Sequence, residues 1–169
     1  MRNENRIRAR TLFRDFMVLS YTEKMQKEIG QGDHGIVYDL GSMAMKIAHD
    51  FIFGAWSEVE SRRKWFSNEF EIGKELHQQG FLVPEMYKLD SYSGKPFIVM
   101  EMIHGSTAQD YIVGRPNEKS RIIDYYEALL ERVVEIGYTP DGKDLTNVIV
   151  ESSTKKLYLI DFSLWERNE

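Results

Sequence analysis

The sequence predicts an α+β fold with two small lobes, and three observations lead to this prediction. Short runs rich in β-branched, aromatic and Met residues, separated by glycine-containing turns, occupy residues 36–48 and 85–102, as is typical of antiparallel strands. Residues 57–78 and 119–136 instead carry apolar side chains at helical spacing. A polar stretch with several turn-forming residues begins at Gly105, so we expect one lobe over residues 1–103 and a second over 104–169.

Composition narrows the class of protein. The chain has 169 residues, a net charge of −5 and no cysteine. The negative charge disfavours a general nucleic-acid binder, and the lack of cysteine excludes disulfides and thiolate metal sites. No run approaches the roughly 20 apolar residues of a membrane helix, and no apolar secretory signal core opens the chain. We expect a cytoplasmic protein without membrane contact, or an effector exported into a host cytoplasm.

The first element in order is a helix over residues 2–20. Four arginines recur every fourth residue, which places them on one stripe of a helix: Arg2, Arg6, Arg10 and Arg14. One interpretation is a basic strip for RNA, an acidic partner or a membrane surface. The other is a solvated face on a helix that packs against the first lobe. We favour the second interpretation.

The next element, residues 29–46, has glycines at GxGxxG spacing: Gly30, Gly32 and Gly35. That spacing alone is weak, because glycines also make turns. The run 36–38 is β-branched and aromatic, which disfavours the helix that a dinucleotide fingerprint needs after its last glycine. A second β run follows at 43–48. The segment therefore reads as a glycine-rich hairpin, whose backbone can approach phosphate oxygens closely because no Cβ intervenes.

Two charged residues in this half are predicted to pair. Lys46 alternates with Met45 and Ile47 and so faces the opposite side of its strand. In the helix over 57–78, Glu69 falls on the apolar face that includes Ile72. A carboxylate buried without a partner is costly, and Lys46 is the natural partner. The alternative is a solvated Glu69 at the rim of that face.

The rest of the first half and the start of the second contain two strands and one helix. Strands are predicted at 85–89 and 97–102 around a turn at 91–94, and the apolar run 97–100 marks a central strand. Residues 105–120 read as polar turns. The helix over 119–136 has a clear apolar face and ends at Gly137.

The second half closes with a hairpin, 148–151 and 157–160. Asn147 enters its first strand and Asp161 leaves its second, so an antiparallel arrangement puts both at the same end. An amide oxygen beside a carboxylate suits Mg²⁺. The alternative is that both are ordinary turn residues, which we would favour without the glycine-rich hairpin.

Taken together, residues 29–162 resemble the protein-kinase superfamily. Six elements appear in that family's order: the glycine-rich loop with Gly30, Gly32, Gly35 and Val37, the strand of Lys46, the helix of Glu69, a hinge at Glu101 and Met102, the loop asparagine Asn147, and Asp161-Phe162-Ser163 in place of the DFG element. The resemblance implies a two-lobed kinase-like fold, with an antiparallel sheet and one main helix in the first lobe. It implies a truncated, mostly helical second lobe with a β-hairpin.

The chain departs from the family in three ways. The HRD signature is absent, and the position of its catalytic aspartate falls on Gly142. Asp141 is our first choice for the base and Asp144 the second, while Lys143 is a candidate for phosphate neutralisation. Ser163 replaces the last glycine of DFG. The sequence ends at Glu169, without an activation segment or most of the family's second lobe, as in compact bacterial effector kinases and RIO-like kinases.

The resemblance implies a phosphotransferase that uses ATP and Mg²⁺, and within that class a bacterial serine/threonine-protein kinase. Lys46 would hold phosphates, oriented by Glu69; the hinge would bind adenine; Asn147 and Asp161 would hold the metal. A protein substrate or an activating protein partner is expected, and Trp165 is either its contact or part of the core. The alternatives are a pseudokinase that binds nucleotide or a partner without transfer, and a small-molecule kinase.

Overall fold

The computed structural model describes residues 2–19, 21–32, 34–49 and 56–168. Its contacts group the chain into two compact units. The first unit is Met1–Phe70 with Glu85–Met102, and the second is Glu71–Pro84 with Ile103–Glu169. The sequence divided the chain once, near residue 103, and did not separate residues 71–84 from the first part. The functional division into two lobes stays a prediction.

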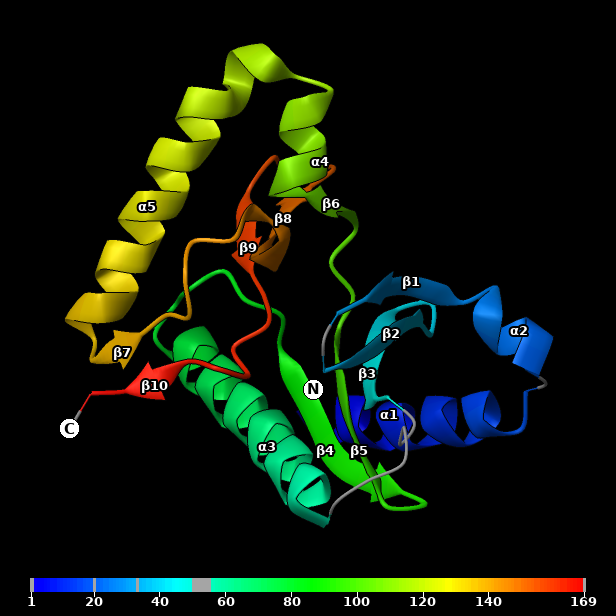
Figure 1. Ribbon diagram of the computed structural model, residues 1–169. Helices are drawn as coiled ribbons and strands as arrows, with labels where there is room; N and C mark the ends of the chain where they lie inside the picture. The colour runs from blue at the N-terminus through cyan, green and yellow to red at the C-terminus, as the bar shows by residue number, and fades with distance from the viewer. Residues whose placement is uncertain (1, 20, 33, 50–55, 169) are drawn as a thin grey trace. The chain divides into compact units, whose positions relative to one another are not determined.

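The first unit is built on a five-stranded antiparallel sheet (Figure 1), as the α+β prediction required. Its strand order is β1-β2-β3-β5-β4. The strands are β1 (Glu28–Gln31), β2 (Gly35–Asp39), β3 (Met43–Ala48), β4 (Met86–Tyr92) and β5 (Lys95–Glu101). Strand β5 has a neighbour on each side, and Phe97, Ile98 and Val99 are completely buried. This confirms the central strand expected from its unbroken apolar run.

The hairpin of β2 and β3 sets the register that positions Lys46. Gly41 takes a left-handed φ of +89° in the turn, and its N–H donates to the side chain of Asp39, a conformation that glycine adopts without strain. The Leu40 N–H bonds the Met43 carbonyl at 2.9 Å. Val37 then lies opposite Lys46 in the ladder.

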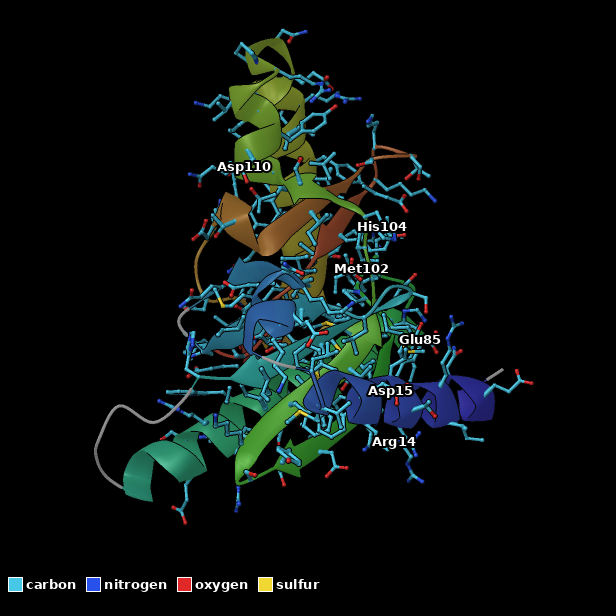
Figure 2. All side chains as sticks on the ribbon, turned by 90° about the vertical axis from the view of Figure 1, so that its right-hand side faces the viewer. Arg14, Asp15, Glu85, Met102, His104 and Asp110 are labelled. Atoms are coloured by element: carbon cyan, nitrogen blue, oxygen red, sulfur yellow. The ribbon has the colours of Figure 1, made fainter. Side chains whose placement is uncertain are left out.

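Helix α1 (Arg2–Met17) packs against this sheet. Ala9 and Phe16 are buried, and the ring of Phe13 stacks on Phe97 with centroids 4.0 Å apart. Arg10 is exposed, and so is Arg14, which lies 3.6 Å from the Asp15 carboxylate (Figure 2). The side chains of Arg2 and Arg6 lie outside the described residues. The packed helix agrees with the interpretation we favoured, whereas a binding role for the arginines stays a prediction.

Helix α3 (Trp56–Gln78) matches the predicted span of 57–78. It ends in a glycine cap: Gly80 has φ +82°, the Phe81 N–H bonds the Leu76 carbonyl at 3.0 Å, and the Gly80 N–H bonds the His77 carbonyl at 3.1 Å. These two bonds satisfy carbonyls that the end of a helix leaves unpaired. A short helix α2 (Tyr21–Met25) was not predicted.

The second unit combines helices with two small sheets. Strands β6-β8-β9 form one sheet and β10-β7 the other. Its elements are β6 (Gly105–Thr107), α4 (Ala108–Val113), η1 (Pro116–Glu118), α5 (Lys119–Glu135), β7 (Tyr138–Thr139), η2 (Leu145–Asn147), β8 (Val148–Glu151), β9 (Leu157–Leu159) and β10 (Glu166–Arg167). The predicted hairpin is therefore the β8–β9 pair, extended by β6. Helix α5 confirms the helix expected over 119–136.

The interpretation of residues 105–120 as polar turns was wrong. Strand β6 pairs with β8 there, and α4 follows it. The Thr107 hydroxyl accepts the Asp110 N–H at 3.1 Å and so caps α4. Ala108 and Tyr111 are buried, but a helix of six residues is too short to show periodicity in the sequence. Among the described residues, no helix combines the length and apolar character needed to cross a bilayer.

The fold makes different demands on two glycines of the glycine-rich hairpin. A Cβ at Gly35 would lie 2.4 Å from the backbone oxygen of Ile47, whereas a Cβ at Gly30 would meet nothing within 4 Å. We predict that Gly35→Ala lowers the free energy of unfolding by about 1–3 kcal/mol, because β2 and β3 must move apart. Gly30→Ala should change it by less than about 0.5 kcal/mol. Urea titration measures both, and equal losses in the two variants would contradict the packing argument.

Candidate functional site

The buried ion pair of Lys46 and Glu69 is the central feature of the first unit. Strand β3 supplies the lysine and helix α3 the glutamate, and their Nζ and Oε2 atoms are 2.7 Å apart. Lys46 is 5% exposed and Glu69 2%. The ammonium group also lies 5.9 Å from the centroid of the Phe66 ring. The predicted pairing is therefore present, and the alternative of a solvated Glu69 is wrong.

The glycine-rich hairpin lies beside this pair along the sheet. Gly30 lies opposite Val37, which in turn lies opposite Lys46. The Gly32 N–H bonds the Gly35 carbonyl at 3.0 Å and closes the turn between β1 and β2. Gly35 has a packing reason to be glycine, as shown above, while Gly30 is exposed and open. Packing therefore does not require a glycine at position 30. Contact of this hairpin with phosphate stays a prediction.

The sequence interpretation missed the anchors of this hairpin. The Nε2 atom of His49 lies 2.7 Å from the Gly32 carbonyl oxygen, to which it donates when that nitrogen carries the proton. Arg62 of α3 donates to the His49 carbonyl at 2.7 Å. The ring of His34 packs on Trp65 with centroids 4.4 Å apart. No spacing in the sequence marks these contacts, because each joins residues more than ten positions apart.

The expected hinge lies at the end of β5. The Glu101 N–H donates to the Glu85 carbonyl at 2.9 Å, and a Glu101 carboxylate oxygen accepts the Glu85 N–H at 3.2 Å. The Glu101 N–H is therefore already bonded within the sheet, which leaves the other backbone groups of Glu101 and Met102 as candidates for adenine. Tyr87 lies nearby, and its burial, together with the charges of Glu85 and Glu101, raises its pKa to about 12.

In the second unit, the backbone brings Asn147 and Asp161 to the same end of the β8–β9 hairpin. Val148 lies opposite Leu159, and the Ile160 N–H bonds the Asn147 carbonyl at 3.0 Å. Asp161 follows directly and has a left-handed φ of +59°. Asp is one of the few non-glycine residues that adopt this region readily, and residues at functional positions often adopt it. The Ser163 hydroxyl donates to Asp161 Oδ1 at 2.8 Å, so the serine that replaces glycine orients the carboxylate.

The donors Asn147 and Asp161 suit Mg²⁺ only when other ligands share its coordination. Among the described residues, no three His, Cys, Asp or Glu side chains are grouped closely enough to hold a metal. Mg²⁺ is commonly bound through one or two carboxylates together with substrate phosphates and water. Asn147 and Asp161 therefore suit an ion that arrives with a nucleotide, and they do not form a closed protein cage.

The two candidate bases differ in what their carboxylates already do. Asp144 caps the η2 helix, where its Oδ1 atom accepts the Thr146 N–H at 2.8 Å. The Asp141 side chain is exposed and makes no ion pair or hydrogen bond with any residue that the structure describes. Gly142, where the resemblance to kinases would place the catalytic aspartate, has φ +75°. The structure thus leaves Asp141 as the more available carboxylate.

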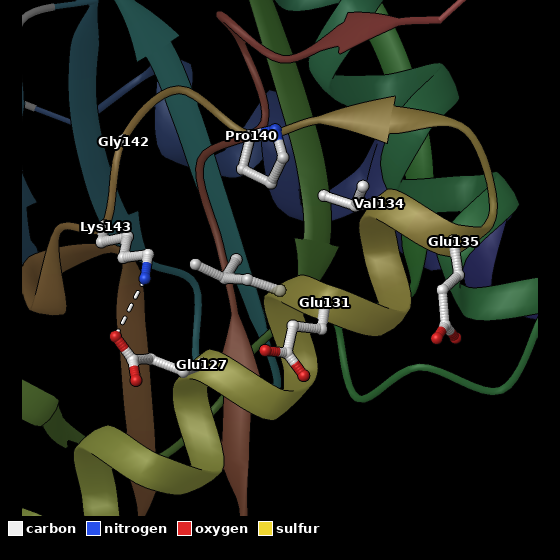
Figure 3. A pocket seen from close by; sticks show the side chains of 8 residues that line it. Glu127, Glu131, Val134, Glu135, Pro140, Gly142 and Lys143 are labelled. Carbon is white, nitrogen blue, oxygen red and sulfur yellow. Dashed lines mark hydrogen bonds and ion pairs between the residues drawn. The ribbon is translucent and has the colours of Figure 1, made fainter.

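Lys143 is engaged away from the role expected for it. Its ammonium group lies 2.9 Å from Glu127 of α5, beside an open depression of about 550 Å³ between α5 and the loop (Figure 3). Pro140, Gly142 and Lys143 form one side, and α5 residues from Glu127 to Glu135 form the other. Phosphate neutralisation by Lys143 would require it to leave Glu127.

The remaining aromatic residue of interest belongs to the core. Trp165 is buried and packs edge-on against the buried ring of Phe162, with centroids 5.0 Å apart. Of the two interpretations offered for Trp165, the structure supports the core. A partner contact cannot use a side chain enclosed in this way without rearrangement of the segment that follows Asp161.

Several solved structures are similar to this chain. A complex of WbdD with the kinase inhibitor LY294002 matches with a TM-score of 0.66 and 19% identity, over 82% of this chain and 32% of that one. A second WbdD structure gives 0.65 and 17%, over 83% and 33%. A third, of the protein described as a bifunctional kinase-methyltransferase, gives 0.62 and 20%, over 80% and 30%. No protein-family model and no curated protein matches the sequence.

The fold is similar to part of a protein described as a bifunctional kinase-methyltransferase. At these identities the likeness concerns the fold alone, and the chain spans about a third of the length of the WbdD chains that it matches. The kinase-like fold agrees with the order of elements found in the sequence, from the glycine-rich hairpin through the strand of Lys46 to the helix of Glu69. The roles of the individual site residues stay predictions.

The buried pair has a measurable structural consequence. We predict that Glu69→Leu lowers the free energy of unfolding by about 3–5 kcal/mol, because it leaves the Lys46 charge buried without this partner. The double variant Lys46→Met with Glu69→Leu should recover most of that loss, since two apolar side chains need no compensation. Urea unfolding measures both.

Glu71→Leu is the matched control, because Glu71 is on the same helix but exposed and pairs with Lys74 at the surface. It should cost less than about 1 kcal/mol. A Glu69→Leu variant no less stable than Glu71→Leu would refute the importance of the pair.

Proposed function

We propose that this protein is a phosphotransferase that uses ATP and Mg²⁺, and that the buried Lys46–Glu69 pair is the observation that carries the proposal. An ion pair withdrawn from water is poor evidence of a stabilising role, since apolar residues of similar size are often as good or better. Its retention in a kinase-like fold is explained if the lysine must be held in one orientation for a ligand. Phosphate oxygens are such a ligand, and Lys provides a compact point charge for them.

The residues of the first unit would bind and orient the nucleotide. Glu69 keeps Lys46 charged and directed, and Lys46 would contact the phosphates. Gly30 offers open backbone beside them, and the backbone of Glu101 and Met102 would receive adenine. Catalysis of phosphoryl transfer rests mainly on such positioning and on neutralisation of charge.

The residues of the second unit would hold the metal and the proton. Asn147 and Asp161 would bind Mg²⁺, which when bound neutralises charge on the phosphates. Ser163 would keep the Asp161 carboxylate turned to one orientation through its hydroxyl. Asp141 would accept the proton of the substrate hydroxyl, since Asp144 already caps η2. A serine or threonine of a protein is the proposed acceptor, and WbdD, a bifunctional kinase-methyltransferase, supports only the coarser assignment of kinase.

One observation favours a second candidate, a pseudokinase that binds nucleotide without transfer. Gly142 stands at the position of the family's catalytic aspartate, and Asp141 has no partner among the described residues that would orient it. A base without an orienting group is less effective. In this case the Lys46–Glu69 pair would serve nucleotide binding alone.

The metal site provides the sharper test. We predict that Asp161→Asn lowers transfer from labelled ATP by about a hundredfold or more, because it removes the only charged donor proposed for Mg²⁺. Asn tolerates the left-handed backbone of this position and keeps an acceptor for Ser163, so the free energy of unfolding should change by less than about 1 kcal/mol. Autophosphorylation, with and without cell extract, is the assay.

Asp124→Asn is the matched control for this variant, because Asp124 also accepts a bond from a serine, Ser120, but is exposed on α5. It should retain full activity. Transfer that survives Asp161→Asn would overturn the proposed metal site. An inactive wild type that nonetheless binds ATP with Lys46-dependent affinity would favour the pseudokinase.

The choice of base is tested separately. We predict that Asp141→Asn lowers kcat by about 10²–10⁴ while the KM for ATP changes little, because proton transfer is affected and binding is not. Asp144→Ala should instead lower the free energy of unfolding by about 1 kcal/mol through loss of the η2 cap. Steady-state kinetics and thermal unfolding distinguish the two. If only Asp144→Ala abolishes transfer in a folded protein, the assignments must be exchanged.

A further inference from the structure

Three side chains far apart in the sequence meet at the end of helix α3. The Nη2 atom of Arg167 lies 2.5 and 2.7 Å from the two carboxylate oxygens of Glu75. Its guanidinium carbon is also 5.5 Å from the centroid of the Tyr138 ring. Tyr138 is buried, and this burial, with the Glu75 carboxylate beside it, raises the pKa of its hydroxyl to about 12. No pattern in the sequence marked Glu75, Tyr138 or Arg167 as partners.

The backbone around these side chains joins the same two segments. Strand β10 pairs with β7, with Arg167 opposite Tyr138 and Glu166 opposite Thr139. Beyond the strand, the Thr139 hydroxyl donates to Asn168 Oδ1 at 2.6 Å, and the Asn168 N–H donates to the Gly137 carbonyl at 2.8 Å. Strand β7 leads directly into the loop of Asp141, and β10 follows Asp161 by a few residues. The segment that follows Asp161 therefore holds the segment that precedes Asp141.

The ion pair differs from an ordinary surface pair. Isolated exposed pairs contribute little, because holding two long side chains costs entropy and water screens the charges. Here the glutamate binds an arginine through both carboxylate oxygens, and the same arginine lies over the ring of a buried tyrosine. Several contacts that share one geometry fix the participants more firmly than a single pair does. The two-residue β7–β10 pairing is too short to be stable by itself.

Helix α3 contains both Glu75 of this cluster and Glu69 of the buried ion pair. Glu75 and Glu69 are six positions apart on one continuous helix, so they occupy different faces of it. One face pairs with Lys46 and the other with Arg167 and Tyr138. The end of helix α3 at Glu75 and the strand before the loop of Asp141 are thus both fastened to Arg167.

We propose that Arg167 is a positioning residue of the phosphotransfer site: by binding Glu75 and covering Tyr138, it holds the end of helix α3 and the strand before the Asp141 loop in the arrangement needed for transfer. It touches neither nucleotide nor substrate. The inference rests on the proposed function for its kinetic consequence, while its structural consequence can be measured without any activity.

Kinetics of Arg167→Ala provide the first measurement. We expect kcat to fall about tenfold, and the KM for ATP to change less than about twofold, because the variant disturbs positioning and removes no ligand contact. The exchange variant, Glu75→Arg with Arg167→Glu, should restore part of the lost kcat, because it forms the ion pair again but no longer places a guanidinium from position 167 over Tyr138. Arg167→Lys should also keep part of it, because the charge remains while the guanidinium plane over Tyr138 is lost.

Arg121→Ala is the matched control. Arg121 is as exposed as Arg167 and also pairs with a partly buried glutamate, Glu118, in the same unit, but it contacts neither proposed site segment. Its kcat should equal that of the wild type. If Arg167→Ala keeps kcat within twofold of the control, or if the exchange variant restores nothing while folded, the proposal is overturned.

Amide hydrogen exchange separates this inference from the proposed function. In Arg167→Ala, amide exchange should accelerate about tenfold in residues 71–78 and in residues 138–144. In Arg121→Ala, exchange in both segments should stay at the wild-type rate. An inactive wild type would refute the phosphotransferase but would leave this readout. Unchanged exchange in either segment overturns the positioning role whatever the activity. Should Arg167→Ala fail to fold, Arg167→Lys and the exchange variant decide by the same two measurements.

Discussion

The ammonium of Lys46 and the carboxylate of Glu69 are removed from water together, and neither could be buried there alone. Their 2.7 Å contact joins a central strand of the sheet to the long helix α3. Desolvation of two charges is expensive, and the attraction between them offsets that cost only when the geometry is accurate. The register of the β2–β3 hairpin and the packing of Phe66 beside Lys46 both serve that accuracy. The pair is therefore the constraint around which the first unit is arranged.

The second unit meets a related demand with different means. A left-handed backbone at Asp161 and a serine hydroxyl on its carboxylate fix one donor, and a hydrogen bond across the hairpin places Asn147 beside it. The left-handed residue Asp161 is followed by two buried aromatic side chains, Phe162 and Trp165. The Arg167 cluster then fastens the end of this segment to β7. Along residues 161–167, a left-handed backbone position, two buried aromatic rings and an ion pair therefore follow one another.

Several parts of this arrangement could be predicted from sequence because they depend on neighbours along the chain. The hairpin β2–β3, the helices α3 and α5 and the central strand β5 each carry a periodic pattern or a turn signal within a few residues. The Lys46–Glu69 pairing also followed from a local oddity, an acid within an apolar stripe, together with one suitable base. Short elements escaped prediction: α4 has too few residues to display a period, and β6 and β10 depend on partners elsewhere.

By itself, the sequence determined the α+β class, the order of the kinase-like elements and the identity of the charged pair, since period, turn chemistry and the cost of a buried charge are local properties. Tertiary structure alone decided which carboxylate remains available in the loop, that Lys143 binds Glu127, and that Trp165 belongs to the core. It also decided that Glu75, Tyr138 and Arg167 meet. These contacts join residues up to 92 positions apart, and their partners are selected by packing of the whole unit rather than by any pattern within one segment.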